Sequence, residues 1–107
     1  MLFRSLADTA PFPVEILRAD TGRCPAPAEA AAYFTVTEAV ADAADRGAGR
    51  ATVTVVHEDG RLVVTVEDDG AVRAASLAAL SDRVGALGGS LLIQPTLCRA
   101  EIPCVSS

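Results

Sequence analysis

The sequence predicts an α/β domain of the two-layer sandwich type, in which one mixed and mostly antiparallel sheet carries its helices on one face. The first reason is the order of the periodic segments, which is strand, helix, hairpin, helix and hairpin. The second reason is size, because 107 residues, 50% of them hydrophobic, suit one globular core. We therefore expect a single domain over residues 1–107, with its core at about residues 11–103.

The first part of the chain predicts a short strand and a long helix. Residues 11–18 have the pattern of a strand, and two prolines in the turn-rich residues 20–27 suit the entry to a helix. The alanine-rich residues 28–46 have high helix propensity, and the glycines that follow at positions 47 and 49 end the helix.

A β-hairpin comes next. Residues 51–56 and 62–66 are alternating runs rich in β-branched side chains, and the Asp59-Gly60 pair lies between them. Such a pair between two strands is typical of a tight hairpin turn.

The last part of the chain predicts a second helix and a second hairpin. The helix has one apolar stripe at positions i, i+3, i+7 and i+10. The residues of this stripe are Leu77, Leu80, Val84 and Leu87. A Gly-Gly pair closes the helix, and residues 90–94 and 97–102 form two strands that turn at Pro95.

The charge composition excludes several classes of function. The net charge is −5, and all nine basic residues are arginine. A chain without lysine has no P-loop lysine, Schiff-base lysine or lysine general base. Its scattered arginines do not form the concentrated basic face that nucleic acid requires, nor a basic amphipathic segment for a membrane surface. We therefore expect no nucleic-acid partner and no membrane contact.

The sequence features that bear on cellular location favour the cytoplasm, whose reducing conditions determine the state expected for the cysteines. No apolar run reaches the roughly 18 residues of a spanning helix, and the first residues show no signal-peptide pattern, so we expect a cytoplasmic protein. Cys24, Cys98 and Cys104 form no C-x-x-C pair and have no zinc-ligand spacing to His57. We expect the cysteines to be small apolar fillers in a reducing cytosol and His57 to be an exposed residue without a chemical role.

A group of three carboxylates and one single carboxylate are candidate sites. At 100° per residue, Glu38, Asp42 and Asp45 share one stripe of the first helix. Carboxylates four residues apart can both reach Mg²⁺, although an ordinary solvated helix face has the same pattern. Alternation places Asp68 on the same side as Val66, and on the core side a carboxylate needs a donor such as a backbone turn, a water or the adenine amine. The alternative is a polar turn that ends the strand.

Four segments carry a further signal through their order and spacing. They are the helix at residues 30–44, the strand and turn at residues 64–70, the helix and Gly-Gly turn at residues 80–91, and the strand at residues 96–103. In this order they resemble the N-box helix, the strand into the D-x-G-x-G motif, the helix after the ATP lid and the closing strand of the ATP-binding catalytic domain of two-component sensor histidine kinases. The resemblance implies the Bergerat (GHKL) ATP-binding fold.

This resemblance implies ATP and Mg²⁺ as cofactors and assigns roles to five residues. Glu38 takes the place of the catalytic carboxylate near the γ-phosphate, and Asp42 takes the place of the Mg²⁺-binding asparagine. Asp68 corresponds to the carboxylate that accepts a hydrogen bond from the adenine amine, and Gly70 and Leu77 also belong to the nucleotide site. Glycine at position 70 can adopt a positive φ and let the backbone approach a ligand closely.

The phosphate-binding parts of the pattern are altered. Asp45-Arg46 stands where the family has a basic pair, so an anion replaces a cation that would face phosphate. Val72 replaces the second glycine of D-x-G-x-G, and residues 74–76 replace a glycine-rich G-x-G. Few residues follow Gly70 before the next helix, so the ATP lid is nearly absent. The resemblance thus implies a degenerate domain with weak or lost nucleotide binding and a regulatory role.

Two alternatives stay open. In a working kinase domain, Asp42 would bind metal and Glu38 would assist phosphoryl transfer to a histidine on another chain or a missing segment, because we expect no dimerisation and phosphoacceptor domain in this chain. The related anti-sigma-factor serine kinases use the same fold to phosphorylate a protein antagonist. The resemblance implies a protein partner, such as a kinase dimerisation domain or a response regulator.

Overall fold

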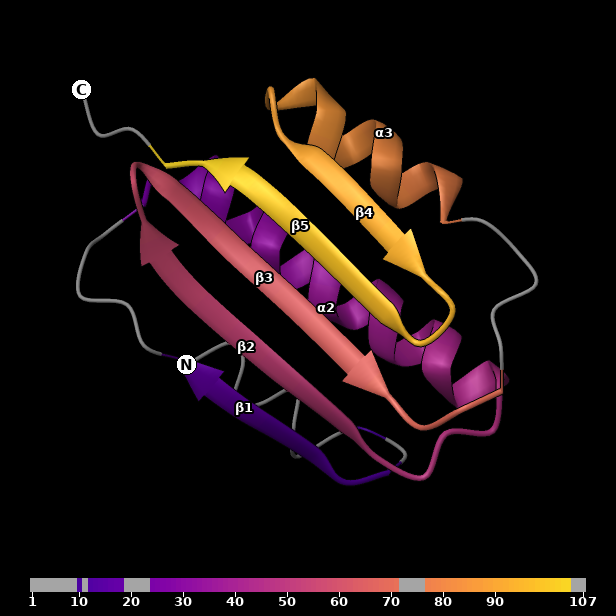
Figure 1. Cartoon of the computed structure of the whole chain (residues 1–107). Helices are drawn as coiled ribbons and strands as arrows, with labels where there is room; N and C mark the ends of the chain where they lie inside the picture. Colours follow the sequence, from indigo (N-terminus) through magenta and orange to yellow (C-terminus); the bar gives the residue numbers. More distant parts are fainter. Residues whose placement is uncertain (1–9, 11, 19–23, 72–76, 105–107) are drawn as a thin grey trace.

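The computed structural model describes residues 10, 12–18, 24–71 and 77–104, and it confirms the predicted fold class. One mixed five-stranded sheet has the strand order β1-β2-β3-β5-β4, and the helices lie on one face of it (Figure 1). Only β1 and β2 pair in parallel, and the other neighbours are antiparallel. The elements are β1 (Val14–Arg18), α2 (Ala26–Asp45), β2 (Ala51–Glu58), β3 (Arg61–Asp68), α3 (Ala78–Ala86), β4 (Ser90–Gln94) and β5 (Leu97–Pro103).

The hairpin of β2 and β3 turns where the sequence predicts. Asp59 and Gly60 both have a positive φ, of 51° and 72°, as a two-residue turn of the type I′ class requires. β2 runs two residues further than expected, to Glu58, because the ladder continues to the pair of Glu58 with Arg61 beside the turn. β3 also runs two residues further, to Asp68, which pairs with Ala51 at the other end of the ladder. The longer ladder places the carboxylate of residue 68 at the very end of β3.

Helix α2 covers the sheet through a face of small side chains and packs mainly on the central strands β3 and β5. Its buried residues are Ala28, Ala31, Ala32, Thr35, Val36, Ala39, Val40 and Ala43. The hydroxyl of Thr35 donates to the carbonyl oxygen of Ala31 at 2.8 Å, so this buried polar group is satisfied. The strands supply larger partners such as Leu62 and Ile102, both fully buried. Small residues on the helix and large ones on the sheet form a single close-packed core.

Both helices end in the same glycine motif. After α2, Gly47 has φ 78°, its amide donates to the carbonyl of Ala44, and the amide of Ala48 donates to the carbonyl of Ala43. After α3, Gly88 has φ 78°, and the amides of residues 88 and 89 make the equivalent bonds. This is the Schellman motif, which satisfies the last carbonyls of a helix. The predicted glycine ends are confirmed at positions 47 and 88.

Helix α3 packs beside β4 and against α2. Leu80 and Val84 of the predicted stripe are buried, whereas Leu87 is 37% exposed after the helix end. The guanidinium of Arg83 lies 4.2 Å from the ring centre of Phe34 on α2, a cation–π contact between the helices.

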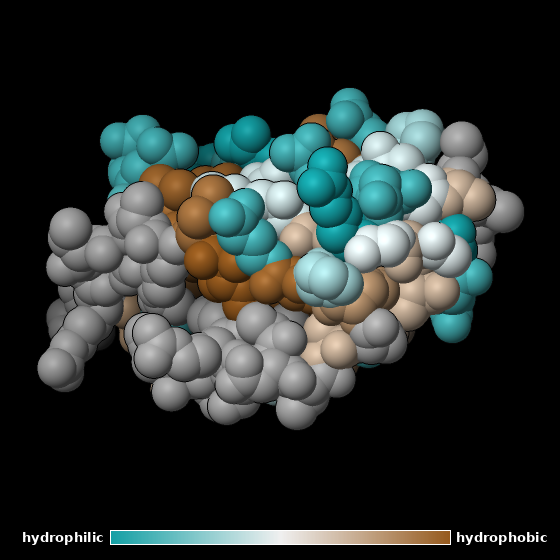
Figure 2. Space-filling view, turned by 90° about the horizontal axis from the view of Figure 1, so that it is seen from below, coloured by the Kyte–Doolittle hydropathy of each residue, from teal (hydrophilic) through white to brown (hydrophobic). Residues whose placement is uncertain are grey.

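Seen from the β1 side in Figure 2, apolar side chains form a band with hydrophilic side chains along one side of it. Within the described residues, no helix is long and apolar enough to cross a membrane.

Substitution of Gly89 tests the close approach of α3 to β5. A Cβ at this position would lie 2.5 Å from the carbonyl oxygen of Glu101 and 2.9 Å from Cγ1 of Val84. We expect Gly89→Ala to lower the free energy of unfolding by about 1–3 kcal/mol, because backbone cannot move aside cheaply. Gly85→Ala is the matched control, since nothing lies within 4 Å of its Cβ. Alanine there should raise the free energy of unfolding by about 0.5–1 kcal/mol, measured by urea denaturation. Equal stability of the two variants would contradict this packing.

Candidate functional site

A buried ion pair joins the C-terminal ends of α2 and β3. Arg46, the residue after α2, places its guanidinium against the carboxylate of Asp68: Nη2 lies 2.7 Å from Oδ2 and Nη1 lies 3.0 Å from Oδ1. The pairing is bidentate, the arrangement that suits the fork of an arginine side chain. The side chains of Arg46 and Asp68 are only 9% and 1% exposed. Each charge therefore depends on the other in a region with little water.

The same guanidinium holds other segments. Nε of Arg46 donates to Oδ2 of Asp42 at 2.8 Å, and Nη1 donates to the carbonyl oxygens of Ala71 at 2.8 Å and Pro95 at 3.4 Å. The hydrogen bond with Asp68 raises the pKa of Arg46 above its usual value, burial opposes this, and Asp42 adds to the increase. The side chain therefore stays cationic and links α2, the end of β3 and the turn between β4 and β5.

Asp68 lies on the core side of β3, as the alternation predicts. Besides the two donors of Arg46, its Oδ1 accepts a hydrogen bond from the amide of Gly70 at 2.9 Å. Three donors thus use three of roughly four acceptor positions of the carboxylate. Gly70 does not adopt the positive φ that a glycine permits at this position. A Cβ there would lie 3.2 Å both from the amide nitrogen of Ala48 and from Oδ1 of Asp68, so this glycine gives room to the protein's own groups.

The carboxylates of α2 do not gather into one site. Asp42 binds Arg46, Glu38 is half-buried, and Asp45 is exposed. Within the described part of the chain, these three do not form a compact group of potential metal ligands. Leu77 is half-buried and packs against the core. The altered glycine positions of the phosphate-binding pattern, at residues 72 and 74–76, lie outside the described residues.

An open pocket lies next to the ion pair. Its volume is about 280 Å³, at the lower limit of typical ligand pockets. It is lined by Arg50, Ala51, Thr52, Glu67, Asp68 and Asp69. Three carboxylates and one guanidinium give this lining a net negative charge.

Asp69 fastens the loop between α2 and β2 to the end of β3. Its Oδ1 accepts hydrogen bonds from the amides of Gly49 at 2.7 Å and Arg50 at 3.0 Å. These two backbone donors lower the pKa of Asp69, since they favour its charged form. The loop that follows the ion pair is thereby held in place.

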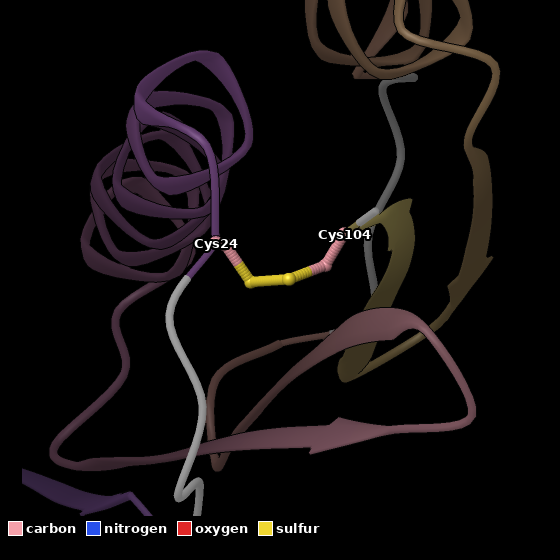
Figure 3. Close-up of a disulfide and its surroundings, with 2 residues drawn as sticks. All are labelled: Cys24 and Cys104. Carbon is pink, nitrogen blue, oxygen red and sulfur yellow. A yellow bond between two sulfur atoms is a disulfide. The ribbon is translucent and has the colours of Figure 1, made fainter. Parts of the chain in front are cut away.

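The structure corrects our expectation for two cysteines. Cys24 and Cys104 are joined by a disulfide, with Cα atoms 5.1 Å apart (Figure 3). They are separated by 80 residues, so their spacing in the sequence carries no signal. Cys98 is a buried thiol outside the disulfide, as expected of a filler. His57 is half-buried in β2 and lies close to both sulfur atoms, so the expectation of an exposed residue was wrong.

Sequence reasoning missed Arg46 as the centre of the site. The family resemblance aligns Asp45-Arg46 with a basic pair that faces phosphate. The contacts of Arg46 with the protein's own carboxylates were therefore not predicted. Two signals were present: the i,i+4 spacing of Asp42 and Arg46 is typical of a helical ion pair, and a core-facing carboxylate needs a donor. Only the fold shows that Arg46 is the partner of both Asp42 and Asp68.

Removal of the Arg46 charge tests the ion pair. We expect Arg46→Met to lower the free energy of unfolding by about 3 kcal/mol, because the buried carboxylate of Asp68 loses its counter-charge. Arg61→Met is the control, since its pair with Glu101 is exposed, at 60% and 31%, and is worth at most about 1 kcal/mol. Urea denaturation at neutral pH measures both. A loss no larger at position 46 than at position 61 would show that Asp68 does not depend on Arg46.

The depressed pKa of Asp69 predicts a pH dependence of stability. A carboxyl whose pKa is lower in the folded state stabilises the fold above its unfolded pKa of about 3.9, and the effect is lost as pH falls through the folded pKa. We expect the free energy of unfolding of Asp69→Asn to fall less steeply from about pH 5 to pH 2 than that of the wild type. If the free energy of unfolding of Asp69→Asn falls with pH as steeply as that of the wild type, the hydrogen bonds from the amides of Gly49 and Arg50 do not have this role.

No family model and no curated protein matches the sequence, but the fold is similar to solved structures. The ATP-binding domain of PrrB from Mycobacterium tuberculosis has a TM-score of 0.65 and 21% identity, covering 98% of this chain and 90% of that one. The blue-light-activated histidine kinase EL346 of Erythrobacter litoralis has a TM-score of 0.73 and 18% identity, covering 96% of this chain. The histidine kinase AdeS of Acinetobacter baumannii has a TM-score of 0.60 and 15% identity, covering 97% of this chain.

The chain spans 42% of the length of the EL346 chain and 60% of the AdeS chain. At these levels of identity the likeness concerns the fold. The chain has the fold of the ATP-binding domain of histidine kinases.

Proposed function

We propose that this chain is a histidine-kinase-type ATP-binding domain in which nucleotide binding is weak or lost, and that its role in two-component signalling is regulatory. The observation that carries the proposal is the bidentate pair of Arg46 and Asp68. The residue that the family resemblance assigns to adenine is engaged by the protein's own cation.

An adenine amine competes poorly for this carboxylate. It must share Asp68 with three existing donors or displace the guanidinium. A neutral amine forms a weaker hydrogen bond than a guanidinium does, and displacement removes one of the two carboxylates that balance the buried arginine. The exchange therefore costs free energy that the rest of the nucleotide must supply.

The charges around the pair also disfavour a polyphosphate. Arg46 balances Asp68, so the remaining charges of the neighbouring pocket are the carboxylates of Glu67 and Asp69 and the guanidinium of Arg50, and Asp45 is exposed at the end of α2. Negative groups at these positions repel phosphate instead of attracting it. The overall charge of −5 acts in the same direction at longer range.

Magnesium meets a similar obstacle at Asp42. A divalent cation bound to Oδ2 would lie next to the guanidinium nitrogen that is 2.8 Å from this oxygen. The residues present therefore do not fit a preformed Mg²⁺ site. A catalytic role for Glu38 would depend on a nucleotide held by other means.

A regulatory domain of this kind acts through contact with another protein. A kinase dimerisation domain or a response regulator is the partner class that the fold favours, and we place the chain with such partners in the cytoplasm. In that compartment the Cys24–Cys104 pair would be kept in its dithiol form.

Nucleotide titration tests the proposal. The purified chain is titrated with a fluorescent ATP analogue in Mg²⁺, together with Asp68→Asn and the control Asp59→Asn, which removes the same charge in the distant hairpin turn. We expect no saturable binding below about 1 mM nucleotide for the wild type or either variant. This limit corresponds to a binding free energy less favourable than about −4 kcal/mol.

Micromolar binding by the wild type that Asp68→Asn abolishes and Asp59→Asn preserves would overturn the proposal. That result would show a working nucleotide site in which adenine reaches Asp68, as the alternative of a functional kinase domain requires. Binding in the micromolar range that neither substitution changes would also contradict it, because the nucleotide would then use a site that does not involve Asp68.

A further inference from the structure

Three potential metal ligands converge at the end of the domain opposite the ion pair. The sulfur atoms of Cys24 and Cys104 and an imidazole nitrogen of His57 all lie within 4.8 Å of one another. None of these residues belongs to the nucleotide site that the family resemblance implies. Their side chains come from three segments: the chain just before α2, strand β2 and the end of β5.

The sheet register explains why His57 faces the cysteines. His57 pairs with Leu62 on β3, and Leu62 pairs with Ile102 on β5, so the three side chains share the core face of the sheet. Cys104 lies two residues after Ile102 on the same face, and its amide donates to the carbonyl of Gly60 at 2.8 Å. Cys24 reaches this point from the start of α2, as Figure 3 shows for the cysteine pair.

We propose that the dithiol form of the chain binds one Zn²⁺ through Cys24 Sγ, Cys104 Sγ and an imidazole nitrogen of His57, with the fourth position open to water. Two thiolates and one imidazole are ligands that zinc prefers. Zn–S and Zn–N bonds of about 2.3 and 2.0 Å place the ligand atoms of a tetrahedral ion roughly 3.5–3.8 Å apart. The three residues can meet this spacing through small side-chain rotations once the disulfide is reduced, because their ligand atoms already lie within 4.8 Å.

The surroundings suit a metal that enters and leaves. Cys104 is buried, whereas Cys24 and His57 are half-buried, so the group is sheltered on one side and reachable from solvent on the other. A site needs such an entry path. The disulfide and the zinc complex use the same sulfur atoms, so they are mutually exclusive states.

Oxidation by a peroxide converts one state into the other. The two zinc-bound thiolates form the S–S bond and release two electrons, Zn²⁺ leaves, and hydrogen peroxide takes up the two electrons and two protons to give two waters. A thiol reductant reverses the sulfur chemistry and restores the ligands. The N-terminal end of α2 is tied to β5 in both states, once by a covalent bond and once by a metal.

Cobalt binding tests the zinc site. The protein is reduced, freed of reductant under nitrogen and titrated with Co²⁺, whose thiolate complexes have a charge-transfer absorption. We expect one equivalent to bind with this absorption and Zn²⁺ to displace it. Cys24→Ser and Cys104→Ser should lose the band, and His57→Gln, which leaves both cysteines in place, should weaken binding at least about tenfold. The control Cys98→Ser should bind as the wild type does.

Other results overturn the proposal. If the reduced wild type shows no thiolate band with excess Co²⁺, there is no dithiolate site. If His57→Gln binds as tightly as the wild type, or if Cys98→Ser loses the band, the ligands are not those named. One equivalent of hydrogen peroxide should release the metal and remove two titratable thiols; metal retained after the thiols are lost would contradict the exchange. None of these outcomes depends on whether the chain binds nucleotide.

Discussion

The buried carboxylate of Asp68 sets the constraint on which one end of the domain depends. A charge that is 1% exposed at the end of β3 requires a cation, and the fold supplies it from the residue that follows α2. To deliver it, the helix must end at residue 45, which the Schellman motif at Gly47 enforces. Strand length, helix length and loop geometry are therefore coupled through one side chain.

Helix α2 is fastened at both ends by different chemistry. Its 20 residues span about 30 Å, with Cys24 just before one end and Arg46 just after the other. Between them, small residues lie on β3 and β5 and contribute by close packing. The ion pair fixes the end where the family resemblance places nucleotide, and the cysteine pair fixes the end that responds to redox state. The helix connects two sites that share no residue.

Local features of the fold could be predicted from the sequence, whereas long-range pairings could not. The Asp59-Gly60 turn and the glycine ends of both helices depend on backbone preferences within a few residues, and they were placed correctly. The side of β3 that carries Asp68 followed from alternation. The partner of Asp68 lies 22 residues away, and that of Cys24 lies 80 residues away. Such pairs depend on how the strands and helices come together, which no short pattern in the sequence records.

The disulfide also changes the connectivity of the chain. It closes residues 24–104 into a covalent ring that contains both helices and every described strand except β1. In the chain-entropy account, closing a loop of this length lowers the entropy of the unfolded chain and thereby stabilises the folded state by about 4.5 kcal/mol. β1 lies outside this ring; among the described elements its backbone lies beside β2 alone, and its side chains Val14 and Ile16 pack against the core. The disulfide therefore constrains the unfolded chain of the ring but not β1, and under oxidising conditions we expect β1 to separate at a lower cost than the ring unfolds, which would uncover the outer edge of β2.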